Sequence, residues 1–155
     1  MKKNENKRRK NNKGFSLVEL IIVIAIMAIL AGVLAPQFVK YLGKSRVAVD
    51  IQNAQNMASA ISAQYAEDAT QSTKKLPDSG KIYNVSDAGA TGSDVEKIQE
   101  VIGGNPAVKV GSGNKFFVTW DADGKVEIYA GADASDVKND HMLYPNVESG
   151  SDWDK

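Results

Sequence analysis

The sequence predicts an α+β protein in which a long N-terminal helix packs on a small antiparallel β-meander. Residues 15–35 form an almost uninterrupted apolar run that leads directly into an amphipathic helical pattern. The C-terminal part holds short β-rich runs separated by glycine-containing turns. With 155 residues, the chain is long enough for one modest domain in addition to a membrane-length helix.

Charge is distributed unevenly along the chain. Residues 1–14 contain seven Lys or Arg residues and one acidic residue, a net charge of +6, and because the whole chain is neutral the remainder carries −6. A basic segment directly before an apolar one predicts a cytoplasmic N-terminus. The alternative, a nucleic-acid-binding arm, lacks interleaved aromatic residues, and the body is acidic, so no nucleic-acid partner is predicted. Cysteine is absent, which excludes disulfides and thiolate sites.

Residues 15–36 are expected to form a transmembrane helix. From Leu20 to Ala35 every residue is apolar or glycine, and counted from Phe15 the run reaches the roughly 20 residues that cross a bilayer. A secretory signal cleaved near Ala35 is the alternative, but its apolar region is normally only about 7 to 15 residues long. That alternative also gives no role to Glu19, whose carboxylate is costly in an apolar segment unless it has a partner.

The helical pattern continues through residues 37–68. Apolar residues at spacings of three and four predict a stripe that packs on the sheet, made of Val47, Ile51, Ala54, Ala58, Ile61 and Tyr65. The intervening polar residues, beginning with Asp50, are assigned to an opposite face suited to water or to neighbouring subunits. Pro36 lacks an amide hydrogen and crowds the carbonyl four residues earlier, so the helix is expected to bend or locally melt within residues 32–43.

Residues 69–106 are expected to connect the helix to the sheet region. Ser93 to Glu96 has the form of a capping box, and Gly103-Gly104 provides a stop signal. A short helix over residues 94–102 is therefore predicted.

Residues 107–155 are expected to hold the β-meander and an acidic C-terminal segment. The meander is predicted from three β-rich runs at residues 107–110, 116–120 and 126–130, with tight turns between them. Further extended segments are expected at residues 81–85 and 142–145.

No catalytic residue, metal or cofactor is predicted. Residues 121–124 resemble the start of a calcium loop, but no bidentate Glu follows, which favours a hairpin turn. His141 is the single histidine and has no matched nucleophile or second ligand. The acidic C-terminal residues lack a recognisable ligand pattern and favour a solvated surface; they are Asp133, Asp136, Asp140, Glu148, Asp152 and Asp154.

The N-terminal residues resemble those of type IV pilin precursors. The resemblance rests on Lys13-Gly14-Phe15-Ser16-Leu17-Val18-Glu19-Leu20, followed by an apolar helix, Pro36, an amphipathic continuation and a β-meander. It implies the pilin fold, removal of leader residues 1–14 by a prepilin peptidase that cuts after Gly14, and N-methylation of Phe15. It also implies that Glu19 supports assembly and that Pro36 lies where the assembled helix loosens.

Cleavage would supply the partner that Glu19 needs, because it creates a positive amine on Phe15. In a filament of staggered subunits, the amine of one helix can meet Glu19 of another, which offsets two burial costs and penalises wrong registers. The resemblance thus implies a non-enzymatic subunit of a homo-oligomeric helical filament for adhesion, surface motility or aggregation. It would be assembled by a platform and ATPase machinery and would pass from the cytoplasmic membrane to the cell surface.

Two alternatives remain open at this point. A pseudopilin of a type II secretion or DNA-uptake system shares the whole N-terminal pattern. A membrane-anchored extracellular binding module or enzyme would keep residues 1–14 or be cut after Ala35. The absence of cysteine departs from many Gram-negative pilins, whose C-terminal loop is closed by a disulfide, and together with the meander and the acidic C-terminal segment it favours a Gram-positive or anaerobic source.

Overall fold

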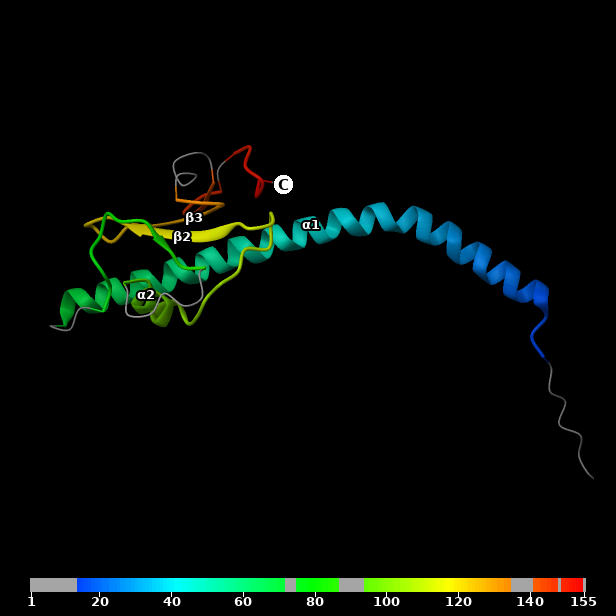
Figure 1. Cartoon of the computed structure of the whole chain (residues 1–155), viewed down its shortest axis with the longest axis horizontal. Helices are drawn as coiled ribbons and strands as arrows, with labels where there is room; N and C mark the ends of the chain where they lie inside the picture. The colour runs from blue at the N-terminus through cyan, green and yellow to red at the C-terminus, as the bar shows by residue number, and fades with distance from the viewer. Residues whose placement is uncertain (1–13, 72–74, 87–93, 135–140, 148, 155) are drawn as a thin grey trace, which may run out of the picture. The chain divides into compact units, whose positions relative to one another are not determined.

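The structure, a computed structural model, describes residues 14–71, 75–86, 94–134, 141–147 and 149–154. Its elements, drawn in Figure 1, are α1 (Leu17–Thr70), β1 (Tyr83–Asn84), α2 (Asp94–Ile102), β2 (Lys115–Trp120), β3 (Val126–Gly131) and β4 (Met142–Tyr144). The chain divides into two compact units, residues 1–40 and residues 41–155, called here the N-terminal unit and the head. One long helix and one antiparallel sheet confirm the predicted α+β class, and α2 has the predicted bounds.

Helix α1 continues without interruption through Pro36. Of the two responses expected at this proline, a bend or local melting, local melting does not occur. Proline removes only one hydrogen bond from the helical ladder, and the apolar residues on both sides keep theirs, so the helix tolerates the loss.

The sheet of the head is an antiparallel meander in the order β1-β2-β3-β4. Strands β2 and β3 pair over their full length, from Lys115 opposite Gly131 to Trp120 opposite Val126. The predicted hairpin turn between them is confirmed, because Asp121 Oδ1 accepts hydrogen bonds from the backbone amides of Asp123 at 3.0 Å and Lys125 at 2.8 Å. Strand β4 confirms the extended segment expected near residues 142–145.

The prediction of a strand at residues 107–110 is wrong. The edge of β2 pairs instead with β1, where Tyr83 lies opposite Val118. The backbone amides of Lys109 and Val110 donate to the carboxylate of Asp50 at 2.8 and 2.9 Å. These two donors are therefore satisfied by a side chain of α1 rather than by a strand ladder.

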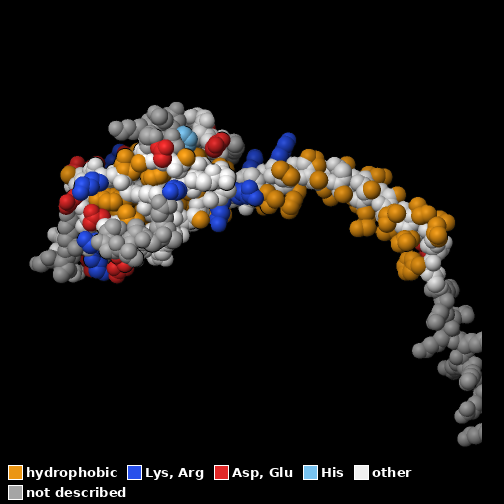
Figure 2. All heavy atoms as spheres, viewed as in Figure 1, with side chains coloured by type: hydrophobic (Ala, Val, Ile, Leu, Met, Phe, Trp, Pro, Cys, Tyr) orange, Lys and Arg blue, Asp and Glu red, His pale blue; other side chains and the backbone are white. Residues whose placement is uncertain are grey.

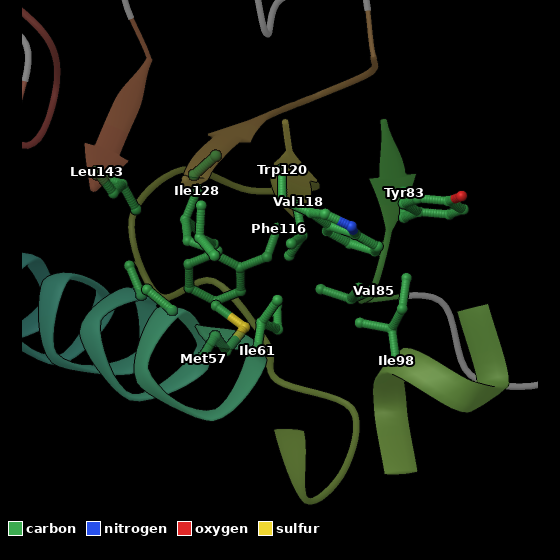
Figure 3. Close-up of a cluster of buried hydrophobic side chains, with 14 of the residues drawn as sticks. Met57, Ile61, Tyr83, Val85, Ile98, Phe116, Val118, Trp120, Ile128 and Leu143 are labelled. Atoms are coloured by element: carbon green, nitrogen blue, oxygen red, sulfur yellow. The ribbon is translucent and has the colours of Figure 1, made fainter. Parts of the chain in front are cut away.

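The core of the head lies between α1, the sheet and α2, as Figure 3 shows. The predicted stripe of α1 contributes four buried residues, while Ile51 and Tyr65 pack against the core partly exposed. Trp120 is 2% exposed and stacks on Tyr83 with a centroid distance of 5.2 Å, so it fills the core as expected. Side chains from all three layers meet here; they include Met57, Ile61, Val85, Ile98, Phe116, Val118, Ile128 and Leu143.

Asp50 belongs to the buried side of α1, so its assignment to the polar face is wrong. It is 0% exposed and lies three residues after Val47 and four before Ala54, which places it on the apolar stripe. Besides the two backbone amides, the indole Nε1 of Trp153 donates to Asp50 Oδ2 at 3.1 Å. Three N–H donors compensate the burial of this carboxylate. They attach the loop at residues 109–110 and the C-terminal segment to α1.

Removing the Asp50 carboxylate is expected to destabilise the head strongly. Asp50→Ala leaves three donors without their acceptor and should lower the free energy of unfolding by roughly 3–5 kcal/mol. Trp153→Phe removes one donor and some packing volume and should cost less, about 1–2 kcal/mol. Circular dichroism of the detergent-solubilised chain during thermal unfolding measures both changes. Asp123→Ala, at an exposed turn position, is the control, and equal stability of all variants would contradict the assigned role.

Gly124 is expected to resist substitution for two separable reasons. Its φ is +81°, and a Cβ at this position would lie 2.6 Å from the ring of Tyr65. Gly113 has a similar φ of +87°, but its Cβ would meet nothing within 4 Å. Gly113→Ala should therefore cost about 1–2 kcal/mol for the left-handed backbone alone, and Gly124→Ala measurably more in the same unfolding assay. Equal costs would show that contact with Tyr65 is unimportant.

Candidate functional site

Three of the predicted site residues lie together at the start of α1. Gly14, Phe15 and Ser16 precede the helix in non-helical conformation, and Glu19 lies in its first turn. The Phe15 side chain is 88% exposed. A Cβ placed on Gly14 would meet nothing within 4 Å, so the described fold does not itself require glycine there. A requirement for glycine at this position would have to come from a molecule that binds the segment.

Glu19 already has a hydrogen-bond partner in this chain, which the sequence reasoning missed. Its Oε2 accepts the backbone N–H of Ser16 at 2.9 Å, and Ser16 Oγ accepts the backbone N–H of Val18 at 3.3 Å. The Glu19–Ser16 bond is one half of a capping box, while Ser16 Oγ caps the amide of Val18, the second residue of the helix, rather than that of Glu19. The signal was available in the sequence, since Ser16-Leu17-Val18-Glu19 has the same Ser-x-x-Glu spacing as residues 93–96.

The position of Glu19 also suits its charge. The first turn of an α-helix presents unsatisfied N–H groups and the positive end of the helix macrodipole, both of which stabilise a carboxylate. Within the part of the chain that the structure describes, the second oxygen, Oε1, has no hydrogen-bond donor. Glu19 can therefore cap its own helix with one oxygen and accept a cation with the other.

The residues that follow Glu19 expose apolar side chains around the helix. Figure 2 shows this surface in orange, and its exposed fractions include 73% for Leu17, 68% for Ile29 and 67% for Val39. An 18-residue window of α1 has a mean hydropathy of 3.0, and none of it is buried. By length and composition this helix can cross a membrane. An apolar surface on every side of a helix requires a non-aqueous environment.

Pro36 is not brought together with the other predicted site residues. It lies in the same helix 17 positions after Glu19, which corresponds to about 25 Å at the usual rise per residue. Its neighbours Phe38 and Val39 are exposed at 62% and 67%. Pro36 is thus one more member of the exposed apolar surface, with no separate site built around it among the described residues.

The remaining candidates from the sequence form no constellation in the described residues. His141 packs edge-on against Trp153, with ring centroids 6.0 Å apart. Within the described ranges, no group of three or more His, Cys, Asp or Glu side chains is placed to hold a metal ion. Asp136, Asp140 and Glu148 lie outside the described residues.

Comparisons with known proteins match the N-terminal part of the chain. The family model described as "Prokaryotic N-terminal methylation motif" matches residues 9–35. Prepilin peptidase-dependent protein A of Clostridium perfringens is 42% identical over 72 residues, which cover 46% of this chain and 51% of that protein. Type IV major fimbrial protein FimA of Dichelobacter nodosus is 43% identical over 49 residues, covering 32% of this chain and 31% of that protein.

A third relative, type IV major pilin protein PilE1 of Neisseria gonorrhoeae, is 43% identical over 53 residues, covering 34% of this chain and 32% of that protein. The matches thus span about half or less of the length of these curated relatives. No solved structure matches. The methylation motif and the named relatives support a type IV pilin with a class III signal, and the α+β fold is consistent with it.

Proposed function

We propose that this chain is a structural subunit of a type IV pilus. It is made as a membrane-anchored precursor, loses residues 1–14 to a prepilin peptidase and polymerises into a helical filament of identical subunits. The observation that carries the proposal is the exposed apolar helix of the N-terminal unit, with a capped carboxylate at its first turn. A monomer in water cannot keep such a surface exposed at acceptable cost.

The apolar surface has two successive environments in this proposal. In the membrane, lipid solvates residues 15–36 while the basic segment stays in the cytoplasm. In the filament, the same surfaces of neighbouring copies replace the lipid. Transfer by an assembly platform and its ATPase therefore exchanges one apolar environment for another, and the subunit moves from the cytoplasmic membrane to the cell surface.

Glu19 links processing to assembly. The acceptor Oε2 already lies 2.9 Å from the amide of Ser16, one residue away from the amine that cleavage after Gly14 would create on Phe15. Methylation of that amine preserves its positive charge. The other oxygen of Glu19 can then accept the Phe15 amine of a neighbouring copy, so the carboxylate caps its own helix and pairs between subunits.

The open alternatives differ in observable ways. A pseudopilin would form only short structures within the envelope, whereas a pilin forms long surface filaments that contain this chain. A membrane-anchored binding module or enzyme would retain residues 1–14 or begin at Pro36. The proposed pilus subunit serves adhesion, surface motility or aggregation.

The mature N-terminus is the first expected outcome to measure. Mass spectrometry of the chain purified from its own cells should give a protein that begins at Phe15 and carries one added methyl group on its amine. Gly14→Val is the matched variant: the described fold has open space there, so the chain should still insert in the membrane but remain uncleaved. An intact Met1, or a start at Pro36, would exclude the proposal.

Substitutions of Glu19 can separate its charge from its capping role. Glu19→Gln keeps an oxygen that can accept the Ser16 amide but removes the charge, so filaments should fall by at least roughly tenfold because an amine is left buried without a counter-ion. Ser16→Ala keeps the charge and loses one cap bond, at about 1 kcal/mol, and should still assemble.

Sheared-filament yield, normalised to processed subunit, is the measurement for these two variants. Glu19→Ala should fail as Glu19→Gln does. Normal filaments from Glu19→Gln would contradict charge pairing and leave helix capping as the role of this residue.

A further inference from the structure

Among the described residues, the head carries unpaired cations at the edge where its portion of α1 begins. This edge, with Lys44, Arg46 and Lys109, is called here the neck edge. Lys44, Arg46 and Lys109 are all exposed. Arg46 and Lys109 line a notch of about 160 Å³, together with Val47, Gly111 and Asp152. Within the described residues, the three cationic side chains have no ion-pair or hydrogen-bond partner. Figure 2 shows Lys and Arg side chains gathered in this region.

One carboxylate of the C-terminal segment, that of Asp152, lies at this neck edge and reduces its positive charge. Asp152 lines the same notch as Arg46 and Lys109, and it also takes part in an interaction of its own. The neck edge therefore retains cationic side chains that another molecule can pair.

The opposite end of the same helix presents acidic side chains. This end of the head, with Glu67, Asp121 and Asp123, is called here the distal edge. Glu67 lies in the last turn of α1, and the turn that holds Asp121 and Asp123 packs beside it, since Tyr65 Oη donates to the carbonyl of Ala122 at 2.5 Å. All three acidic residues are exposed, and none forms an ion pair among the described residues. Arg46 and Glu67 are 21 positions apart in α1, about 30 Å along its axis.

Lys125 lies in the turn beside this distal edge, and its side chain is already engaged. Its Nζ donates to Glu127 Oε1 at 2.8 Å, which raises the pKa of Lys125 and lowers the pKa of Glu127. The nearby Asp121 carboxylate contributes less to the raised pKa of Lys125 than Glu127 does. Lys75, whose backbone amide donates to Asp68 Oδ2 at 3.1 Å, also lies at the end of α1. The acidic side chains described at this edge still outnumber the lysines, so it keeps net negative charge.

We infer that the neck edge of one head binds the distal edge of the head of a second copy. This inference rests on the proposed filament, in which parallel, staggered copies bring the start of one head against the end of the next. Such a head-to-tail contact repeats without closing and thus builds a helix. Parallel copies in register would bring like charges together, whereas parallel copies shifted by about one head length bring opposite charges together, so the two edges favour the staggered arrangement.

Charge reversal tests the contact. The neck variant Lys44→Glu/Arg46→Glu and the distal variant Glu67→Lys/Asp123→Lys should each lower sheared-filament yield by roughly fivefold, the scale of a few exposed ion pairs. The combined four-residue variant should recover most of the loss. Lys97→Glu on α2, an exposed position whose described ion pair is with Asp94 at 3.6 Å, is the control and should assemble normally.

The outcomes separate this contact from the proposed function. Normal yields from the two reversed variants, or no recovery in the combined variant at equal levels of processed subunit, would overturn the contact while wild-type filaments still support the pilus subunit. Loss of the neck variant from the membrane before assembly would show that the neck edge binds anionic lipid. That result would also overturn the proposed contact between heads. Absence of wild-type filaments would overturn the proposed function and the contact together.

Discussion

The apolar first half of α1 is the constraint on which the rest of the structure depends. None of its most hydrophobic window is buried, and its large apolar side chains are exposed from Leu17 to Val39. The head does not need that surface, because its own core closes between the second half of α1, the sheet and α2. The head therefore folds through contacts within the chain. Covering the apolar surface of the N-terminal helix, in contrast, requires lipid or other copies of the chain.

The head contains no cysteine, and a buried carboxylate links its distant segments to α1. Asp50 connects α1 to residues 109–110 and to Trp153, two segments that lie 59 and 103 positions away in the sequence. A carboxylate is a poor choice for burial unless its acceptors are satisfied, and here both oxygens receive N–H donors. The same bonds hold the C-terminal segment against the helix. The position of Trp153 is thus fixed by packing and by one directional bond.

Local patterns made most of the fold predictable. The capping box and glycine stop located α2, the Asp-containing turn located the β2–β3 hairpin, and the spacing of Val47 to Tyr65 located the core side of α1. The errors share one cause. The polarity of Asp50 predicts a solvent-facing position although its spacing places it on the stripe, and β propensity predicts a strand at residues 107–110 although the amides of Lys109 and Val110 bind that same carboxylate. The position of Asp50 on the helix is visible in the sequence, but its bonds to residues 59 and 60 positions away leave no local signal.

At the N-terminus, the resemblance to pilin precursors predicts the site, but the structure adds a hydrogen bond of Glu19 within its own helix. The sequence alone predicts a carboxylate without a partner until cleavage, whereas in the structure the backbone amide of Ser16 already donates to one of its oxygens. A carboxylate that caps its own helix is held at the first turn and loses little freedom when a cation arrives. This capping bond would thus lower the entropic cost of pairing with an amine. On this view the cap orients the charge in the precursor, and cleavage supplies the amine that the oriented charge can bind.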